Sequence, residues 1–219
     1  MPAWGATLAT IPAHIVRFGS APALIALGGR EPNTWTFTAL SDAALRLATG
    51  LRQHGLGRGE MVAVIATGGP AAVVAILAAI AAGGVAVPLD PELDGQTLAR
   101  MVTESGCRFG FVAAKREPPP LAPGAGAIRF FRLDGATIDW TVPPWTELLA
   151  SVAEPAVIPE PDETAVIVYT SGTTGTPKAV PLTHANIVAN LAALLEQGLI
   201  GSGDRAVKIC GGCGSAALI

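Results

Sequence analysis

The sequence predicts an α/β fold, built of βαβ units, in which a mostly parallel sheet carries helices on both faces. Strand-like and helix-like segments alternate along the chain, which is the βαβ rhythm of such a sheet. The strand-like segments include continuous apolar runs such as "MVAVIA" at 61–66, typical of strands that are buried on both faces. Hydrophobic residues make up 50% of the 219 positions, which is enough to build a substantial core.

Helices and strands follow in order through the first half of the chain. The first predicted helix covers 36–55 and ends at Gly55. Its apolar residues recur at helical spacing and share one face: Leu40, Ala44, Leu47 and Leu51. The segments after it alternate in type: strand 61–66, helix 70–82, strand 84–88, helix 94–106 and strand 108–112.

The segment "AAVVAILAAIAAGGVAVPL" at 71–89 carries no charge and is about long enough to cross a membrane. Two glycines, Gly83 and Gly84, interrupt it, and Pro88 follows them. A helix with Pro70 in its first turn, ended by the glycines and followed by a buried strand, fits these residues better. We therefore expect no membrane span.

Two proline-rich linkers, at 115–126 and 153–163, divide the second half of the chain. The elements predicted around them are a strand at 127–133, a short helix near 143–151, strands at 164–169 and 179–182, and a helix over 183–198. Thr183 is the expected N-cap of that last helix. Its inward residues are predicted to be Ile187, Leu191, Leu194 and Leu195.

Composition excludes several classes of protein. A net charge of −3 with 14% charged residues gives no basic surface for nucleic acid. Three cysteines are too few for a disulfide framework and indicate a reducing compartment. The first ten residues lack the basic and apolar regions of a signal peptide. These features predict a cytoplasmic protein.

The most informative stretch is "YTSGTTGTPKAV" at 169–180, which follows a predicted strand. Glycines in such a loop let backbone N–H groups converge on an anion. Small hydroxyls add donors without bulk, and a lysine offsets the charge of a polyphosphate. The pattern therefore predicts a phosphate-binding loop, with a polar surface turn between two strands as the alternative. The candidate binding residues are Thr170, Ser171, Gly172, Thr173, Thr174, Gly175 and Lys178.

The spacing of this loop does not fit the two common nucleotide-binding motifs. A Walker A loop requires G-x-x-x-x-G-K followed by Ser or Thr. Counting five places from Gly172 reaches Pro177, and Ala179 follows the lysine. The GxGxxG pattern also fails, because Gly172 and Gly175 lack its third glycine. The spacing thus argues against a P-loop kinase or ATPase.

Residues 167–178, "IVYTSGTTGTPK", resemble the AMP-binding signature of the adenylate-forming superfamily: acyl-CoA synthetases, peptide-synthetase adenylation domains and luciferases. Further stretches resemble the family in the same order, namely "WTFTALSDAALRLATGLRQHGL", "ILAAIAAGGVAVPLDPE", "LTHANIVAN" and "GDR" at 203–205. The resemblance covers about residues 10–207.

This resemblance implies a ligase that activates a carboxylic acid. ATP and the acid would form an acyl adenylate with release of pyrophosphate, and the acyl group would pass to a thiol of CoA or of carrier-protein pantetheine. Mg²⁺ is expected to accompany ATP. By position, Thr170 to Gly175 would hold the β- and γ-phosphates, and Lys178 would be the catalytic residue. The acyl-CoA synthetase branch, and hence fatty acid metabolism, is the first expectation; a peptide-synthetase adenylation domain is the second.

The sequence departs from the family at two places. Ala179 stands where the family usually has Gly, which could restrict the loop or the approach of a ligand. After residue 207 the chain reads "KICGGCGSAALI" where the family continues with its later motifs. We therefore expect 1–207 to be an incomplete AMP-binding domain and 208–219 a divergent tail, from an early stop, a shifted reading frame or a deliberate shortening.

Three functional outcomes follow from that departure. The chain alone is expected to be inactive, and association with a missing C-terminal half is expected. A non-catalytic fragment, such as the product of a pseudogene, is the alternative to an enzyme.

Cys210 and Cys213 form a C-x-x-C pair without a second pair to complete a zinc site, so the tail is expected to be unstructured. His184 is expected to support the loop, and the family resemblance offers a role near the substrate as the alternative.

Overall fold

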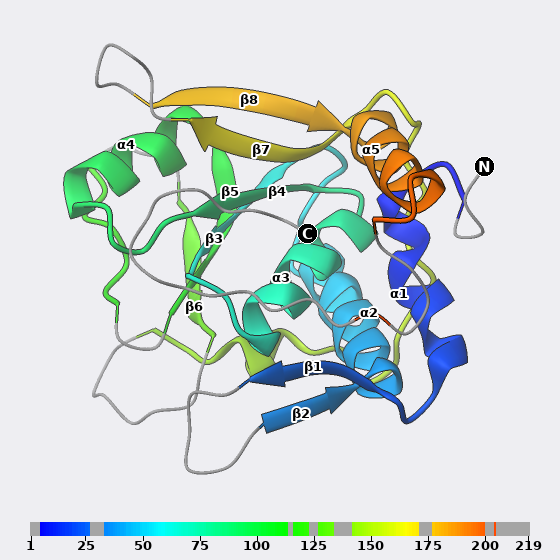
Figure 1. The fold of residues 1–219 in the computed structure, drawn as a ribbon. Coiled ribbons are helices and arrows are strands. Elements are labelled where there is room, and N and C mark those ends of the chain that lie inside the picture. Colours follow the sequence, from blue (N-terminus) through cyan, green and yellow to red (C-terminus); the bar gives the residue numbers. More distant parts are fainter. Residues whose placement is uncertain are drawn as a thin grey trace.

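The computed structural model describes residues 5–26, 33–113, 116–122, 127–133, 142–170, 177–199 and 204. Within them lies a central sheet of six strands in the order β6-β5-β3-β4-β7-β8 (Figure 1). Its strands are β3 (Met61–Ile65), β4 (Val85–Leu89), β5 (Cys107–Val112), β6 (Arg129–Arg132), β7 (Thr164–Thr170) and β8 (Lys178–Thr183). All neighbouring strands pair in parallel except β7 and β8, which are antiparallel. The predicted mostly parallel sheet is confirmed.

Helices lie on both faces of this sheet, as predicted. Helices α2 (Phe37–Gln53) and α3 (Pro70–Ala81) pack on one face, and α4 (Gly95–Glu104) packs on the other. The side chains of β3 show why both faces are needed. Val62 and Val64 join the core on the α2 and α3 side, whereas Ala63 and Ile65 join the core beneath α4. Alternate side chains of a strand point to opposite faces. An all-apolar strand is therefore buried only when helices pack on both faces of its sheet.

The predicted face of α2 is buried along its whole length. Leu40, Ala44, Leu47 and Leu51 are each at most 5% exposed. Thr36 caps the helix by accepting a hydrogen bond from the Ala39 N–H at 3.1 Å. The sequence periodicity therefore placed this helix and its inward face correctly.

The apolar segment at 71–89 is a helix followed by a strand. Pro70 occupies the first turn of α3, and Gly83 follows the helix with a φ of 82°, a conformation that favours glycine. The chain then enters β4. Within the part of the chain that the structure describes, no helix has the length and hydrophobicity needed to cross a membrane.

The N-terminal segment holds structure that the sequence analysis did not predict. It contains the 3-10 helix η1 (Leu8–Thr10), the helix α1 (Ile11–Ile15), the 3-10 helix η2 (Val16–Phe18) and a hairpin of β1 (Pro22–Ala26) with β2 (Asn33–Thr36). The hairpin forms a separate antiparallel sheet, and α1 lies against α2 (Figure 1). These elements are too short to show periodicity in sequence.

The helix α5 (His184–Glu196) begins where it was predicted, and two of its four predicted inward residues, Ile187 and Leu191, are partly buried against the core. Thr183 forms a capping box with Asn186, so the predicted N-cap is confirmed. His184 and Val188 are the buried residues of the helix, whereas Leu195 is 40% exposed. The prediction that Leu195 faces inward is wrong, because α5 packs on the described core only through its first turns. The helix near 143–151 is the 3-10 helix η3 (Trp145–Leu148).

Candidate functional site

The predicted phosphate-binding loop connects β7 to β8. The two strands pair as far as the last residue of β7 and the first residue of β8, with Tyr169 opposite Ala179 and Thr170 opposite Lys178. The structure thus brings the first and last predicted site residues together at the end of the hairpin where the connecting loop begins and ends. Both side chains are exposed to solvent. The other five predicted residues lie outside the described part of the chain: Ser171, Gly172, Thr173, Thr174 and Gly175.

This hairpin end lies at the edge of the sheet where the parallel strands finish. β7 runs parallel to β4, with Val166 beside Ala86, so Thr170 lies at the carboxyl end of the sheet together with the ends of β3 and β4. Ligands of open α/β sheets bind at that edge, because the loops after the strands gather there. The location therefore suits a ligand-binding loop.

Tyr169 anchors the hairpin to the rest of the molecule. Its hydroxyl lies 2.7 Å from the Ser105 hydroxyl and donates to the Met101 carbonyl oxygen at 3.2 Å. Burial raises the pKa of Tyr169, so the phenol stays protonated and available as a donor. The sequence analysis did not assign Tyr169 a role. Only its place inside the signature could have indicated one, since its partners at the C-terminal end of α4 are 64 and 68 positions away.

Ala179 stands where the family usually has glycine, and its backbone conformation shows whether alanine is tolerated there. Ala179 lies inside β8, paired with Tyr169, and no described residue other than glycine has a positive φ. An alanine is therefore not strained at this position.

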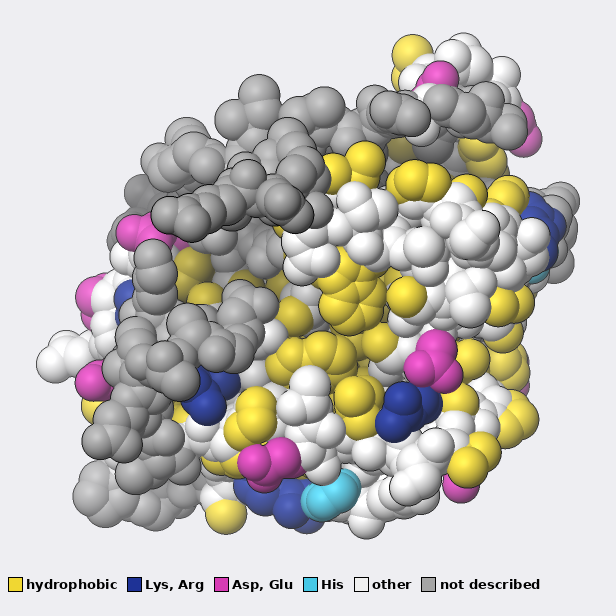
Figure 2. Space-filling view, turned by 90° about the horizontal axis from the view of Figure 1, so that it is seen from below, with side chains coloured by type: hydrophobic (Ala, Val, Ile, Leu, Met, Phe, Trp, Pro, Cys, Tyr) yellow, Lys and Arg dark blue, Asp and Glu magenta, His cyan; other side chains and the backbone are white. Residues whose placement is uncertain are grey.

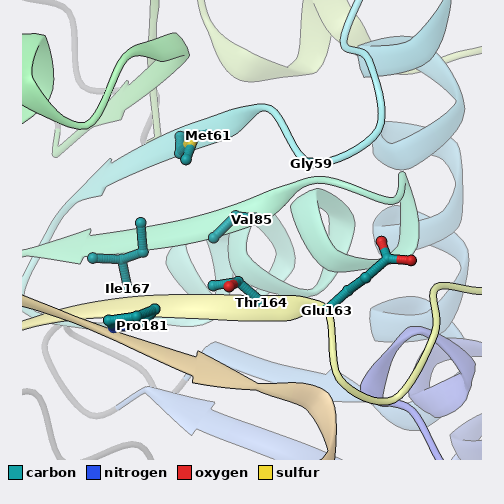
Figure 3. A pocket seen from close by; sticks show the side chains of 7 residues that line it. All are labelled: Gly59, Met61, Val85, Glu163, Thr164, Ile167 and Pro181. Atoms are coloured by element: carbon teal, nitrogen blue, oxygen red, sulfur yellow. The ribbon is translucent and has the colours of Figure 1, made fainter.

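A separate cavity of about 320 Å³ lies at the opposite edge of the sheet (Figure 3). Its lining residues come from the beginnings of β3, β4 and β7 and from β8: Gly59, Met61, Val85, Glu163, Thr164, Ile167 and Pro181. Its one carboxylate, on Glu163, points away from Met61, Ile167 and Pro181 in Figure 3 and pairs with Arg58. This cavity is therefore not at the predicted phosphate site, which follows the far end of β7.

The remaining reactive side chains of the described chain do not form a second site. Burial raises the pKa of the Cys107 thiol to about 12, so this cysteine stays protonated and is a poor nucleophile. It behaves as the small buried hydrophobe its sequence context indicates. Cys210 and Cys213 lie outside the described residues. Among the residues that are described, no three His, Cys, Asp or Glu side chains gather into a potential metal site.

Comparison with known proteins identifies the family. The model of the AMP-binding enzyme family matches residues 12–209, which is most of the chain. The protein therefore belongs to the AMP-binding, or adenylate-forming, enzymes.

Individual relatives belong to two branches of this family. The chain is 31% identical to the pyochelin synthetase PchE of Pseudomonas aeruginosa over 195 residues, which cover 89% of this chain and 12% of the relative. It is 31% identical to a feruloyl-CoA synthase from Amycolatopsis sp. over 173 residues, which cover 78% of this chain and 33% of the relative. The chain thus spans a third or less of the length of these relatives.

A solved structure shows the same fold. The fatty acyl-adenylate ligase from L. pneumophila, solved with acyl adenylate and pyrophosphate, has a TM-score of 0.71 at 22% identity. The match covers 90% of this chain and 34% of the ligase. The sheet and its helices are therefore an arrangement found in adenylate-forming enzymes.

Proposed function

We propose that this chain carries the pyrophosphate-binding hairpin of a ligase that converts a carboxylic acid and ATP into an acyl adenylate. The observation that carries the proposal is the pairing of Thr170 with Lys178. It places a hydroxyl and an ammonium group at either side of a loop whose sequence is rich in Gly, Ser and Thr. The family match over residues 12–209 supports the same chemistry.

The hairpin would act on the leaving group of the reaction. A carboxylate oxygen attacks the α-phosphorus of ATP, and the bond from that phosphorus to the bridging oxygen breaks. The electron pair goes to pyrophosphate, so negative charge grows on the β- and γ-phosphates. Lys178 and the loop donors would stabilise that charge, which is how phosphoryl-type transfers are mainly catalysed. A thiol, of CoA or of a carrier protein, then attacks the acyl carbon and AMP leaves.

The donor set fits a phosphate ligand better than a bare metal ion. Thr170 and Lys178 offer a hydroxyl and an ammonium group, and Lys178 can only donate hydrogen bonds. Mg²⁺ prefers oxygen ligands and usually reaches nucleotide sites on the phosphates themselves. We therefore propose that Mg²⁺ enters with ATP, and that Lys178 contacts phosphate oxygens that the metal leaves free.

Relatives of both branches resemble this chain to the same degree. PchE is a synthetase and the Amycolatopsis protein is a feruloyl-CoA synthase, and both match with 31% identity. We propose the acyl-CoA synthetase type first, with a peptide-synthetase adenylation domain as the second candidate. The two are distinguished by the acceptor thiol, free CoA or carrier-bound pantetheine.

Titration calorimetry of the chain with pyrophosphate, and separately with Mg·ATP, tests the proposal. We expect Lys178→Ala to weaken pyrophosphate binding about tenfold or more, since one hydrogen bond to a charged group contributes about 1.5 kcal/mol or more. Lys178→Arg should retain part of the affinity. Arg17→Ala is the matched control, because it removes the same charge from an exposed residue of η2.

Equal losses in Lys178→Ala and Arg17→Ala would mean that only net charge matters, and would contradict a specific site. No binding of either ligand would favour the non-catalytic fragment. Hydrolysis of ATP without any carboxylic acid would favour an ATPase instead.

A further inference from the structure

His184 connects the N-terminal segment to the start of α5 through one buried hydrogen bond. The Leu8 N–H donates to His184 Nδ1 at 3.2 Å, across 176 positions of sequence. The His184 side chain is only 1% exposed and is one of few buried polar residues among those described. The bond ties η1, at the start of the chain, to the first residue of α5, directly after the β7–β8 hairpin.

This bond fixes the charge and the tautomer of the imidazole. A backbone N–H can only donate, so Nδ1 must be the unprotonated acceptor and the ring hydrogen must be on Nε2. An imidazolium has a hydrogen on both nitrogens and cannot accept. The bond to Leu8 therefore exists only while His184 is neutral.

Among the described residues near η1, no side chain caps it in place of His184. Thr7 occupies the N-cap position, but its side chain makes no capping hydrogen bond. Its Oγ1 is buried without a hydrogen-bond partner. The first N–H groups of a helix need an acceptor from elsewhere, and for Leu8 that acceptor is His184.

The surroundings of His184 favour the neutral ring. It is the first residue of α5, where the helix dipole disfavours a cation. Its backbone N–H donates to the Glu163 carbonyl oxygen at 3.0 Å. Burial lowers the pKa of His184, and the charge of Glu163 opposes that shift only in part. Glu163 is held by Arg58.

Within the part of the chain that the structure describes, few other charges lie on the elements packed around the ring. The segment before β7 also carries Glu160 and Asp162. Neither η1 nor the adjacent α3 contains a charged residue, and α1, which also contacts η1, carries the titratable His14. In β8 and α5 the charged residues, Lys178 and Glu196, lie at the ends distant from His184. Protonation of the ring would thus gain little compensation beyond Glu163.

We propose that His184 is a proton-sensitive clamp: as a neutral ring it holds the N-terminal segment against the base of the β7–β8 hairpin, and as an imidazolium it releases that segment. His184 is here a positioning residue, which acts through Leu8. The inference does not depend on nucleotide binding by the loop.

The direction of the pH effect follows from linkage. Since the folded state lowers the pKa of His184 from its ordinary 6.5, the clamp is complete above about pH 6.5 and is lost as the pH falls through the folded value. The population in which Leu8 is released should rise by up to about tenfold per pH unit in that range.

Hydrogen exchange of the Leu8 amide, measured between pH 5 and 8 and corrected for intrinsic rates, tests the clamp. In the unmodified chain, protection of Leu8 should fall as the pH drops below about 6.5. In His184→Asn, the side-chain oxygen can accept near the Nδ1 position without titrating, so the remaining protection should not depend on pH. His14→Asn is the matched control and should keep the original profile.

A second measurement needs no variant. NMR of the imidazole nitrogens should show a neutral His184 with its hydrogen on Nε2 at pH 7.5, changing to imidazolium in the same pH range in which Leu8 loses protection. Constant protection of Leu8 from pH 8 to 5, a ring hydrogen on Nδ1, or an unchanged pH dependence in His184→Asn would each overturn the proposal.

Discussion

At the scale of single residues, Glu163 has the most strongly shifted pKa among the carboxylates of the described chain. The Arg58 guanidinium donates to it from two nitrogens, and the Glu160 N–H donates to it at 3.1 Å. These contacts lower the pKa of Glu163 from 4.5 to about 2. The pair joins the loop before β3 to the entrance of β7, and so fixes the start of the strand that leads to the candidate site.

Glu163→Gln should remove one part of the acid sensitivity of folding. Because the folded state lowers this pKa, Glu163 stabilises the protein fully above about pH 4.5, and the contribution is lost as the pH falls towards 2. Urea unfolding at a series of pH values should therefore give a flatter curve for the variant between pH 4.5 and 2. Glu104→Gln, on the exposed side of α4, is the control and should match the unmodified curve. Identical slopes for Glu163→Gln and the original chain would refute this account.

At the scale of elements, α2 is held by the segment around η3, which crosses it closely. The Ala150 N–H donates to the Arg46 carbonyl oxygen at 3.2 Å, and the Arg46 Nε donates back to the Ala150 carbonyl oxygen at 2.8 Å. Gly50 makes this approach possible. A Cβ at Gly50 would lie 1.6 Å from the Leu148 carbonyl oxygen, so the helix accepts a glycine in its interior where Ala would otherwise be favoured.

Gly50→Ala should destabilise the protein, despite the better helix propensity of alanine. The propensity gain is about 1 kcal/mol, but the added methyl group meets backbone that cannot move aside, and overpacking costs about 1–3 kcal/mol or more. We expect a net loss in the free energy of unfolding, measured in urea. Gly57→Ala is the matched control, since its Cβ would meet only the Glu60 side chain at 3.4 Å or more. A Gly50→Ala variant as stable as Gly57→Ala would show that the crossing segment can shift.

At the scale of the whole molecule, two cores share the strands of one sheet. The core on the α2 and α3 side includes Leu47, and the core beneath α4 includes Leu98, each 0% exposed. β3 contributes alternate residues to both. On the face seen from below Figure 1, hydrophobic side chains also gather in a hollowed central area, with charged ones around it (Figure 2). The two buried cores should unfold together, because neither can lose β3 without exposing the other.

Leu47→Ala and Leu98→Ala should each lower the stability of the same cooperative transition. A Leu→Ala change in a packed core lowers the free energy of unfolding by about 2–5 kcal/mol. The two sites lie on opposite faces of the sheet, so the two losses should add when both changes are combined. Tryptophan fluorescence and far-UV circular dichroism should report one urea midpoint in each variant. Separate midpoints for the two signals, or a Leu98→Ala variant that leaves the tryptophan transition unchanged, would indicate two independently folding units.

Local patterns in the sequence determined much of this architecture. The periodic residues of α2, the apolar run of β3, and the proline and glycines around α3 specify their elements through neighbours a few positions away. The signature at 167–178 likewise identified the family, which the match over residues 12–209 confirms. The roles of the individual loop residues stay a prediction.

Only the tertiary structure decided which distant groups meet. β1 and β2 were missed because a short hairpin gains its stability from packing on other elements, and Leu195 was misassigned because burial depends on what covers a helix. The pairing of Thr170 with Lys178 required the antiparallel register of β7 and β8. The contact of Leu8 with His184 spans 176 positions. Such contacts depend on the path of the whole chain, and no local pattern of residues specifies that path.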